Sequence, residues 1–134
     1  FKNSNEFSQS IDLIKSYNCI PGIFIDVYEE INEDLLNIIK EKEINWVILM
    51  GVPVGFGGQP FDINVFGKLS ALRNFSTSQN LNIKLEIDGG LSFENIKLCQ
   101  NLGANYLSGW SIINSKTLDA LNKRIKKLQN ILNS

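Results

Sequence analysis

Residues Trp46–Met50 form an unbroken apolar run, W-V-I-L-M, which is too short for a helix and too apolar for a half-exposed strand. This pattern is typical of a parallel strand that is buried on both faces, and we predict such a strand here. The loop that follows contains Gly51, Gly55, Gly57 and Gly58. Because glycines let the backbone come close to a ligand and present its N–H groups, the loop is a candidate anion site. A tight turn without a ligand would use the same residues.

Short apolar runs alternate with amphipathic patterns along the rest of the chain. We expect further strands at residues 22–27, 83–88 and 106–110, with helical patterns before, between and after them. This alternation is typical of βαβ units that build a parallel sheet, so the predicted fold class is α/β. Four such units correspond to half of a TIM (β/α)8 barrel of about 250 residues. A doubly wound open sheet fits the same alternation, but the chain lacks the G-x-G-x-x-G motif that would support it.

Polar residues mark the expected ends of the helices. The candidate N-caps are Ser8 or Ser10 for the first helix, Ser92 for the fourth, and Ser115 or Thr117 for the last. In the second helix, Asn32 precedes two acidic residues that suit a helix N-terminus. Residues 61–73 carry the pattern of the third helix, and the polar residues 76–80 resemble a loop.

The composition bounds the class of protein. With 134 residues, 43% of them hydrophobic, the chain can form one domain with a real core. A net charge of −1 with no basic stripe argues against nucleic acid or an anionic membrane as a partner, and no apolar run approaches the roughly 20 residues of a membrane span. The chain does not begin with Met, so we expect it to be part of a longer polypeptide.

The cysteines and the absence of histidine limit the kinds of catalytic and metal site that this chain can form. Cys19 and Cys99 lie far apart and match no metal or redox spacing, so we expect buried, reduced thiols in a cytosolic protein. The chain contains no histidine. These residues therefore cannot supply a Ser-His or Cys-His pair or a His-ligated metal.

Three successive predicted strands end in residues suited to binding an anion. They lead into the glycine loop, into Asp88-Gly89-Gly90 and into Gly109-Trp110-Ser111. In a barrel these ends share the face that carries the active site, where the loops after the last two strands commonly hold phosphate. We predict that the backbone N–H groups of Gly89, Gly90, Gly109 and Trp110 form a phosphate cradle. The alternative is that these glycines only close turns.

Asp88 is the carboxylate placed at a strand end beside such a loop. It could act as a general acid and base or as a metal ligand, and a plain helix-capping role would use the same position. Asp26 also ends a predicted strand but lacks adjacent glycines, so we interpret it as a cap or turn residue.

Three motifs resemble those of the ribulose-phosphate 3-epimerases. Residues 50–61, M-G-V-P-V-G-F-G-G-Q-P-F, are similar to the family's M-T-V-x-P-G-F-G-G-Q-x-F on strand six. Residues 87–90, I-D-G-G, resemble V-D-G-G on strand seven, and residues 102–109 resemble the A-G-A-D-x-x-V-A-G that leads to the last strand. The resemblance covers nearly the whole chain. It predicts one domain over residues 1–134 that forms the C-terminal half, about the last four βα units, of a ribulose-phosphate-binding barrel.

The resemblance implies a cytoplasmic, metal-dependent isomerase that epimerises C3 of a ketose phosphate through an enediolate. The substrate would be D-ribulose 5-phosphate, giving D-xylulose 5-phosphate, or a close analogue such as allulose 6-phosphate. Asp88 matches a catalytic aspartate that is also a metal ligand, and Met50 matches a methionine of the substrate pocket. Gly55, Gly57 and Gly58 match the loop that closes over the substrate phosphate. A homo-oligomer is one option for the assembly.

The resemblance also implies one divalent metal ion per site, Zn, Fe, Mn or Co. The family's other aspartate and its two metal-binding histidines lie on strands two and three, so we expect the remaining ligands in an N-terminal half. Without that half the fragment would be inactive.

The chain departs from the family pattern at several places. Gly51 replaces a threonine, Pro53-Val54 replaces Asn-Pro or Glu-Pro, Trp110 replaces a serine, and residues 26–29 replace N-P-x-T. The substrate therefore need not be ribulose 5-phosphate. The alternative is a catalytically degenerate paralogue that binds a sugar phosphate. A different phosphate-binding barrel, aldolase-like or thiamin-phosphate-synthase-like, is a third option, against which G-F-G-G-Q argues.

Overall fold

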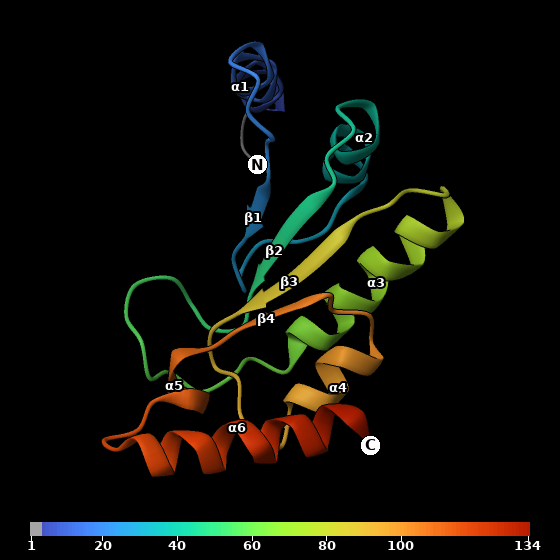
Figure 1. Ribbon diagram of the computed structural model, residues 1–134. Coiled ribbons are helices and arrows are strands. Elements are labelled where there is room, and N and C mark those ends of the chain that lie inside the picture. The colour runs from blue at the N-terminus through green and yellow to red at the C-terminus, as the bar shows by residue number, and fades with distance from the viewer. Residues whose placement is uncertain (1–3) are drawn as a thin grey trace.

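The computed structural model describes residues 4–134 and shows helices and strands in alternation (Figure 1). The elements are α1 (Ser4–Ser16), β1 (Ile23–Ile25), α2 (Glu33–Glu41), β2 (Trp46–Met50), α3 (Asn64–Ser78), β3 (Lys84–Asp88), α4 (Ile96–Asn101), β4 (Tyr106–Ser108), α5 (Trp110–Ile113) and α6 (Leu118–Asn133). The strands form one four-stranded sheet in the order β1-β2-β3-β4, and each neighbouring pair is parallel. The predicted α/β class with a parallel sheet is confirmed.

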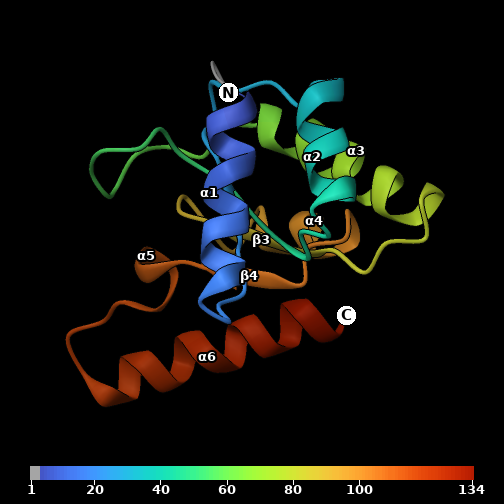
Figure 2. The ribbon, with the colours of Figure 1, turned by 90° about the horizontal axis from the view of Figure 1, so that it is seen from above.

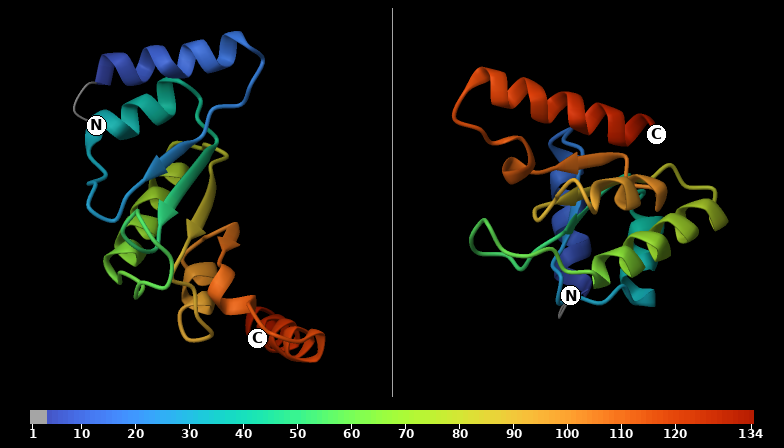
Figure 3. Two further views of the ribbon diagram at one scale, coloured as in Figure 1. Left: turned by 90° about the vertical axis from the view of Figure 1, so that its left-hand side faces the viewer. Right: turned by 90° about the horizontal axis from the view of Figure 1, so that it is seen from below.

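One face of the sheet carries the core. In register, Ile25 lies opposite Leu49, and Leu49 lies opposite Ile87. All three side chains are buried, because they point to the side on which α2, α3 and α4 pack (Figures 1 and 3). Figure 2 shows α1 beside α2 at one end of this layer, and these two helices are in contact. The largest fully buried core residues of the helices are Leu35, Ile39, Leu69, Leu72, Val65 and Cys99.

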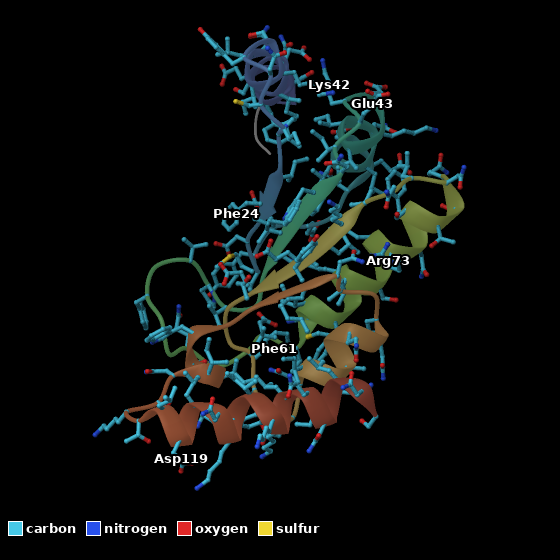
Figure 4. The ribbon with its side chains drawn as sticks, in the orientation of Figure 1. Phe24, Lys42, Glu43, Phe61, Arg73 and Asp119 are labelled. Carbon is cyan, nitrogen blue, oxygen red and sulfur yellow. The ribbon has the colours of Figure 1, made fainter. Side chains whose placement is uncertain are left out.

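The opposite face of the sheet is open in residues 4–134. Along β2, Trp46, Ile48 and Met50 are only partly buried and alternate with fully buried residues. Phe24 of β1 is 46% exposed and lies on the side away from α2 and α3 (Figure 4). The prediction that Trp46–Met50 is buried on both faces is therefore wrong. This open face is mixed, since β3 contributes Lys84, Glu86 and Asp88 to it. A sheet face without cover is what half of a closed barrel presents, because the other half would complete both the sheet and its interior.

Two helices differ in length from the prediction. α1 begins at Ser4, before both predicted caps, and the Ser10 hydroxyl instead donates to the carbonyl of Glu6 at 2.9 Å inside the helix. α3 continues to Ser78, through residues predicted as loop. The reason is that Thr77 donates to the carbonyl of Arg73 at 3.0 Å and buried Ser76 to that of Leu81 at 2.7 Å, so both hydroxyls are satisfied without leaving the helix.

The other boundaries are closer to expectation. Asn32 caps α2 through Leu35 N–H, and Thr117, rather than Ser115, caps α6. The Ser92 hydroxyl accepts from two N–H groups in the turn that leads to α4, which itself begins at Ile96.

The last predicted strand and one predicted thiol need correction. The strand expected at residues 106–110 ends at Ser108, because the chain turns at Gly109 and Trp110 opens α5. The strand expected at residues 22–27 is likewise shortened to β1. Cys99 is buried as expected, but Cys19 lies on the exposed turn after α1, so its predicted burial is wrong.

Candidate active site

The carboxyl ends of β2, β3 and β4 enclose a cavity of about 350 Å³. Its walls include most of the residues that the sequence singled out: Met50, Gly55, Gly57, Gly58, Asp88, Gly89, Gly90 and Trp110. Gly109 lies outside this set and lines the neighbouring groove beneath α6 together with Trp110. Residues from three separate segments therefore meet at one place, because the ends of parallel strands share one edge of the sheet.

Met50 and Asp88 are neighbours at the floor of the cavity. They are register partners at the last position of β2 and β3. Both side chains lie on the open face of the sheet, since the residues that alternate with them face the helices. Ser108 pairs with Asp88 from the other side. The sheet thus fixes the carboxylate of Asp88 between β2 and β4.

The environment of Asp88 favours its protonated form. Partial burial raises the pKa of the Asp88 carboxyl above its usual value, and the nearby carboxylate of Glu86 raises it further. Glu86 is itself held in place, because one oxygen accepts from the indole N–H of Trp46 at 2.9 Å and the other from the Ser108 hydroxyl at 2.6 Å. A carboxyl with a raised pKa at a cavity floor suits a group that accepts and returns a proton.

Gly51 and Gly90 are glycines for packing reasons. A Cβ at Gly51 would lie 2.2 Å from the carbonyl oxygen of Gly89, so the chain leaving β2 fits only without a side chain. Gly90 has φ +65°, and a Cβ there would lie 3.0 Å from the Cα of Phe61. Val52 packs against this same crossing. For these positions, turn formation is a sufficient explanation.

The glycines of the loop itself lie in open space. A Cβ added at Gly55, Gly57 or Gly58 would meet no described atom within 4 Å. Gly55 and Gly58 have φ of +146° and +81°, which a side chain would strain, whereas Gly57 has no positive φ. Nothing within residues 4–134 therefore requires glycine at position 57. A glycine in open space leaves its backbone accessible to a ligand.

The predicted phosphate cradle is only partly available. The N–H of Gly89 donates to the carbonyl of Ser108 at 3.0 Å, so it serves the sheet and is not free for a ligand. Gly109 precedes α5, which no side chain of residues 4–134 caps. Ser111 in α5, which the sequence analysis named in the last strand-end segment without giving it a role, also lines the cavity. Arg124 of α6 holds α5 in place by donating to the carbonyls of Ser111 at 3.1 Å and Ile112 at 2.8 Å.

Two further residues, to which the sequence analysis gave no role in the site, shape the glycine loop at residues 52–61. Gln59 donates from its amide to the carbonyl of Pro53 at 2.7 Å and to that of Phe56 at 2.8 Å. Asp26, at the end of β1, accepts from Val54 N–H at 3.4 Å, beyond the turn role predicted for it. The position of Gln59 in the G-F-G-G-Q motif could have indicated a role in the loop. The contact between Asp26 and Val54 could not have been predicted, because no motif links these two positions.

The described residues could supply a single ligand to a metal ion at this site. Asp88 is the one Asp, Glu, His or Cys among the residues that line the cavity. No group of three such side chains that could hold a metal occurs anywhere in residues 4–134. The oxygen of a carboxylate fits a divalent ion, so Asp88 is compatible with one ligand position of the expected metal. None of the helices that the structure describes is long and apolar enough to cross a bilayer.

Comparison with known proteins decides the family. The sequence model of the ribulose-phosphate 3 epimerase family matches residues 1–113. The chain belongs to this family. A ribulose-phosphate 3-epimerase of Buchnera aphidicola subsp. Schizaphis graminum is 32% identical over 132 residues, which cover 97% of this chain and 57% of the relative. The enzyme of that name from Serratia marcescens is 31% identical over 110 residues, covering 82% and 51%.

This chain thus spans only 51–57% of the length of the two ribulose-phosphate 3-epimerases just named. Alignment with a solved structure also covers only about half of the other protein. The YdjI aldolase from Escherichia coli K12 aligns with a TM-score of 0.57 over 98% of this chain and 54% of that protein, at 12% identity. At that identity the likeness concerns the fold alone. The four βα units therefore form part of a larger α/β barrel fold, as predicted.

Proposed function

We propose that the protein to which this chain contributes a half-barrel epimerises C3 of a ketose phosphate. The substrate is D-ribulose 5-phosphate, interconverted with D-xylulose 5-phosphate, or a close analogue such as allulose 6-phosphate. The observation that carries the proposal is the position of Asp88 on the floor of a cavity whose rim is the glycine loop. Family membership over residues 1–113 supports it.

The reaction needs a proton carrier on each side of the substrate. One group removes the proton from C3 to leave an enediolate, and a second group returns a proton to the opposite face, which inverts C3 with no net change in atoms or electrons. Asp88 supplies one of these groups, and its raised pKa suits it to hold the proton in turn. Because Asp88 is the sole carboxylate lining the cavity in residues 4–134, we propose that the second carrier comes from the part of the barrel outside this chain.

A divalent metal ion, when bound, supplies positive charge that stabilises the enediolate oxygens, and Asp88 is the residue here that would hold it. Met50, the register partner of Asp88, provides an apolar wall beside the reacting carbon. Such a wall excludes water from the proton-transfer path.

The phosphate of the substrate is placed at the rim of the cavity. The open backbone of Gly55, Gly57 and Gly58 can approach a phosphate closely, and Gly90 and Trp110 line the same cavity. Backbone N–H groups arranged around a concavity bind anions without a cationic side chain. This arrangement fits the lining, which contains no lysine or arginine.

The proposal is tested by exchange of the C3 proton of D-ribulose 5-phosphate with deuterated water, followed by NMR on the full-length protein with added divalent metal. Removing a general acid or base typically slows a reaction by about 10²–10⁴-fold, so Asp88→Asn should lower exchange by about 100-fold or more. Asp119→Asn is the matched control, since Asp119 pairs with Lys123 on the exposed surface of α6. Exchange in Asp88→Asn at the rate of the Asp119→Asn control would rule out the role of Asp88.

A second candidate, a sugar-phosphate-binding protein without catalysis, is favoured by one observation. Trp110, which replaces the family's usual serine, is 74% exposed and presents its indole beside the cavity. Wild-type protein that binds D-ribulose 5-phosphate but shows neither C3 exchange nor xylulose 5-phosphate formation, with Zn, Fe, Mn or Co supplied, would establish this candidate instead.

A further inference from the structure

The glycine loop is closed at its base. It leaves β2 after Gly51 and ends where Asp62 N–H donates to the Gly51 carbonyl at 2.8 Å. Between these points the chain projects beyond the end of the sheet on its open side (Figure 1). The loop contains three exposed glycines, which have more backbone freedom to lose on ordering than other residues. A loop of this composition needs a specific restraint to keep one shape.

Gln59 supplies such a restraint from within the loop. Its terminal amide carries two N–H donors, which matches its two contacts, to Pro53 and Phe56 carbonyls at 2.7 and 2.8 Å. The side chain is partly buried although the neighbouring Gly57 and Gly58 are exposed. Gln59 therefore draws the first half of the loop back onto its second half.

The same half of the loop is held from outside. Asp26 accepts from Val54 N–H at 3.4 Å, and Asp26 itself sits in a segment fixed by Lys68. The Lys68 ammonium donates to the carbonyls of Asp26 at 3.1 Å, Val27 at 2.7 Å and Glu29. Residues 53–56 are thus held on one side by Gln59 and on the other by the anchored Asp26. Of these two, Gln59 is the contact within the loop, and it sets the curvature of the loop.

We propose that Gln59 is a positioning residue that holds the glycine loop in its ligand-binding shape before the substrate arrives. Because the loop is already ordered, binding a phosphate does not carry the cost of the conformational entropy that a mobile loop would lose. The consequence for catalysis rests on the proposed function. A restraint that acts equally on bound substrate and transition state changes KM and leaves kcat in place.

The test compares Gln59→Glu with Gln59→Lys in the full-length protein. Glutamate has the same length but no donor, and its charge would face two carbonyl oxygens. Lysine keeps donors at a similar reach, as Lys68 shows with its own carbonyl partners. Losing two neutral hydrogen bonds corresponds to about a tenfold shift in the population of the ordered loop. We expect Gln59→Glu to accelerate amide hydrogen exchange at residues 52–61 and raise KM about tenfold with kcat nearly unchanged. Gln59→Lys should resemble the wild type both in its amide hydrogen exchange and in its KM.

Exchange measured without substrate separates this inference from the proposed function. Unchanged exchange at residues 52–61 in Gln59→Glu overturns the positioning role whether or not the protein is an enzyme. If the wild type lacks epimerase activity, the proposed function is wrong but the role of Gln59 is still testable. The dissociation constant of D-ribulose 5-phosphate is then measured in place of KM. Should Gln59→Glu unfold, which accelerated exchange throughout the sheet would reveal, the uncharged Gln59→Met is measured in its place. An increase in KM for Gln59→Lys equal to that of Gln59→Glu would also overturn the inference, since the donors would then not matter.

Discussion

The N–H of Gly51 donates to the carbonyl of Asp88 at 2.7 Å, which ties β2 to β3 at the point where both strands reach the cavity. The same contact brings the backbone of Gly51 so close to Gly89 that a Cβ would lie 2.2 Å from the Gly89 carbonyl oxygen. The pairing that fixes the backbone of Asp88 beside β2 therefore also requires that residue 51 have no side chain.

Gly51→Ala should destabilise the protein. Because the nearest atom is backbone, it cannot rotate away, and the strain is comparable to overpacking a core, about 1–3 kcal/mol. Urea unfolding followed by circular dichroism measures the change. An unfolding free energy equal to that of the wild type would mean that the two strand ends separate at no cost.

Gly67→Ala is the matched substitution with the opposite expected sign. Gly67 is exposed in α3, and a Cβ there meets no described atom within 4 Å. Since glycine inside a helix is about 0.8–1.0 kcal/mol less favourable than alanine, the variant should be more stable by about that amount. The same urea experiment checks it, and destabilisation would contradict the placement of Gly67 in the helix.

Gly57→Ala tests whether the glycine loop binds a phosphate. The protein has room for the methyl group and no positive φ at this residue, so folding and stability should not change. A phosphate that approaches the backbone would meet the methyl group, and we expect KM for D-ribulose 5-phosphate to rise about tenfold or more, as for loss of a well-placed contact. An unchanged KM, with stability equal to the wild type, would limit these glycines to turn formation.

Trp110→Ser restores the family's usual residue at the edge of the cavity. The indole is largely exposed, so its removal should leave stability within about 0.5 kcal/mol, as for most surface substitutions. A hydroxyl donor beside the proposed phosphate position should lower KM for phosphorylated sugars. The measurement is the KM of wild type and variant for D-ribulose 5-phosphate, and equal values would assign position 110 to the turn alone.

The two thiols should differ in reactivity. Burial raises the pKa of Cys99 from 9.0 to about 11, whereas Cys19 lies exposed. Because the thiolate is the reactive form, Ellman's reagent at pH 8 should modify Cys19 in the native protein and Cys99 only after unfolding in urea, with the modified residue identified by mass spectrometry. A raised folded-state pKa gives stability that is fully present below pH 9.0 and lost as the pH rises toward about 11. Rapid titration of both native thiols at pH 8 would contradict the burial of Cys99.

Much of the fold and the site could be predicted from local patterns. The bounds of β2, the start of α2 after Asn32 and the choice between Ser115 and Thr117 as the cap of α6 follow from patterns within a few residues. The residues at the strand ends could be grouped into one site, because parallel strands bring their carboxyl ends to a single edge whatever the side chains are. Met50, Asp88 and the loop glycines therefore met as expected.

Contacts between distant residues could not be predicted in this way. The extent of α3 depends on hydroxyls that find carbonyl partners, including that of Leu81 beyond the helix. The engagement of Gly89 N–H by Ser108 depends on the pairing of β3 with β4. Residue type alone gives no sign of either.

Periodicity, caps and short motifs are local properties, so they were enough to predict the alternation of strands and helices, the sheet edge at which the site residues meet, and the family. The folded arrangement was needed to show that one face of Trp46–Met50 stays open, that residue 51 has no room for a side chain, and that Gln59 and Asp26 hold the glycine loop. The physical reason is that burial, close approach and hydrogen-bond geometry depend on which segments the fold places side by side.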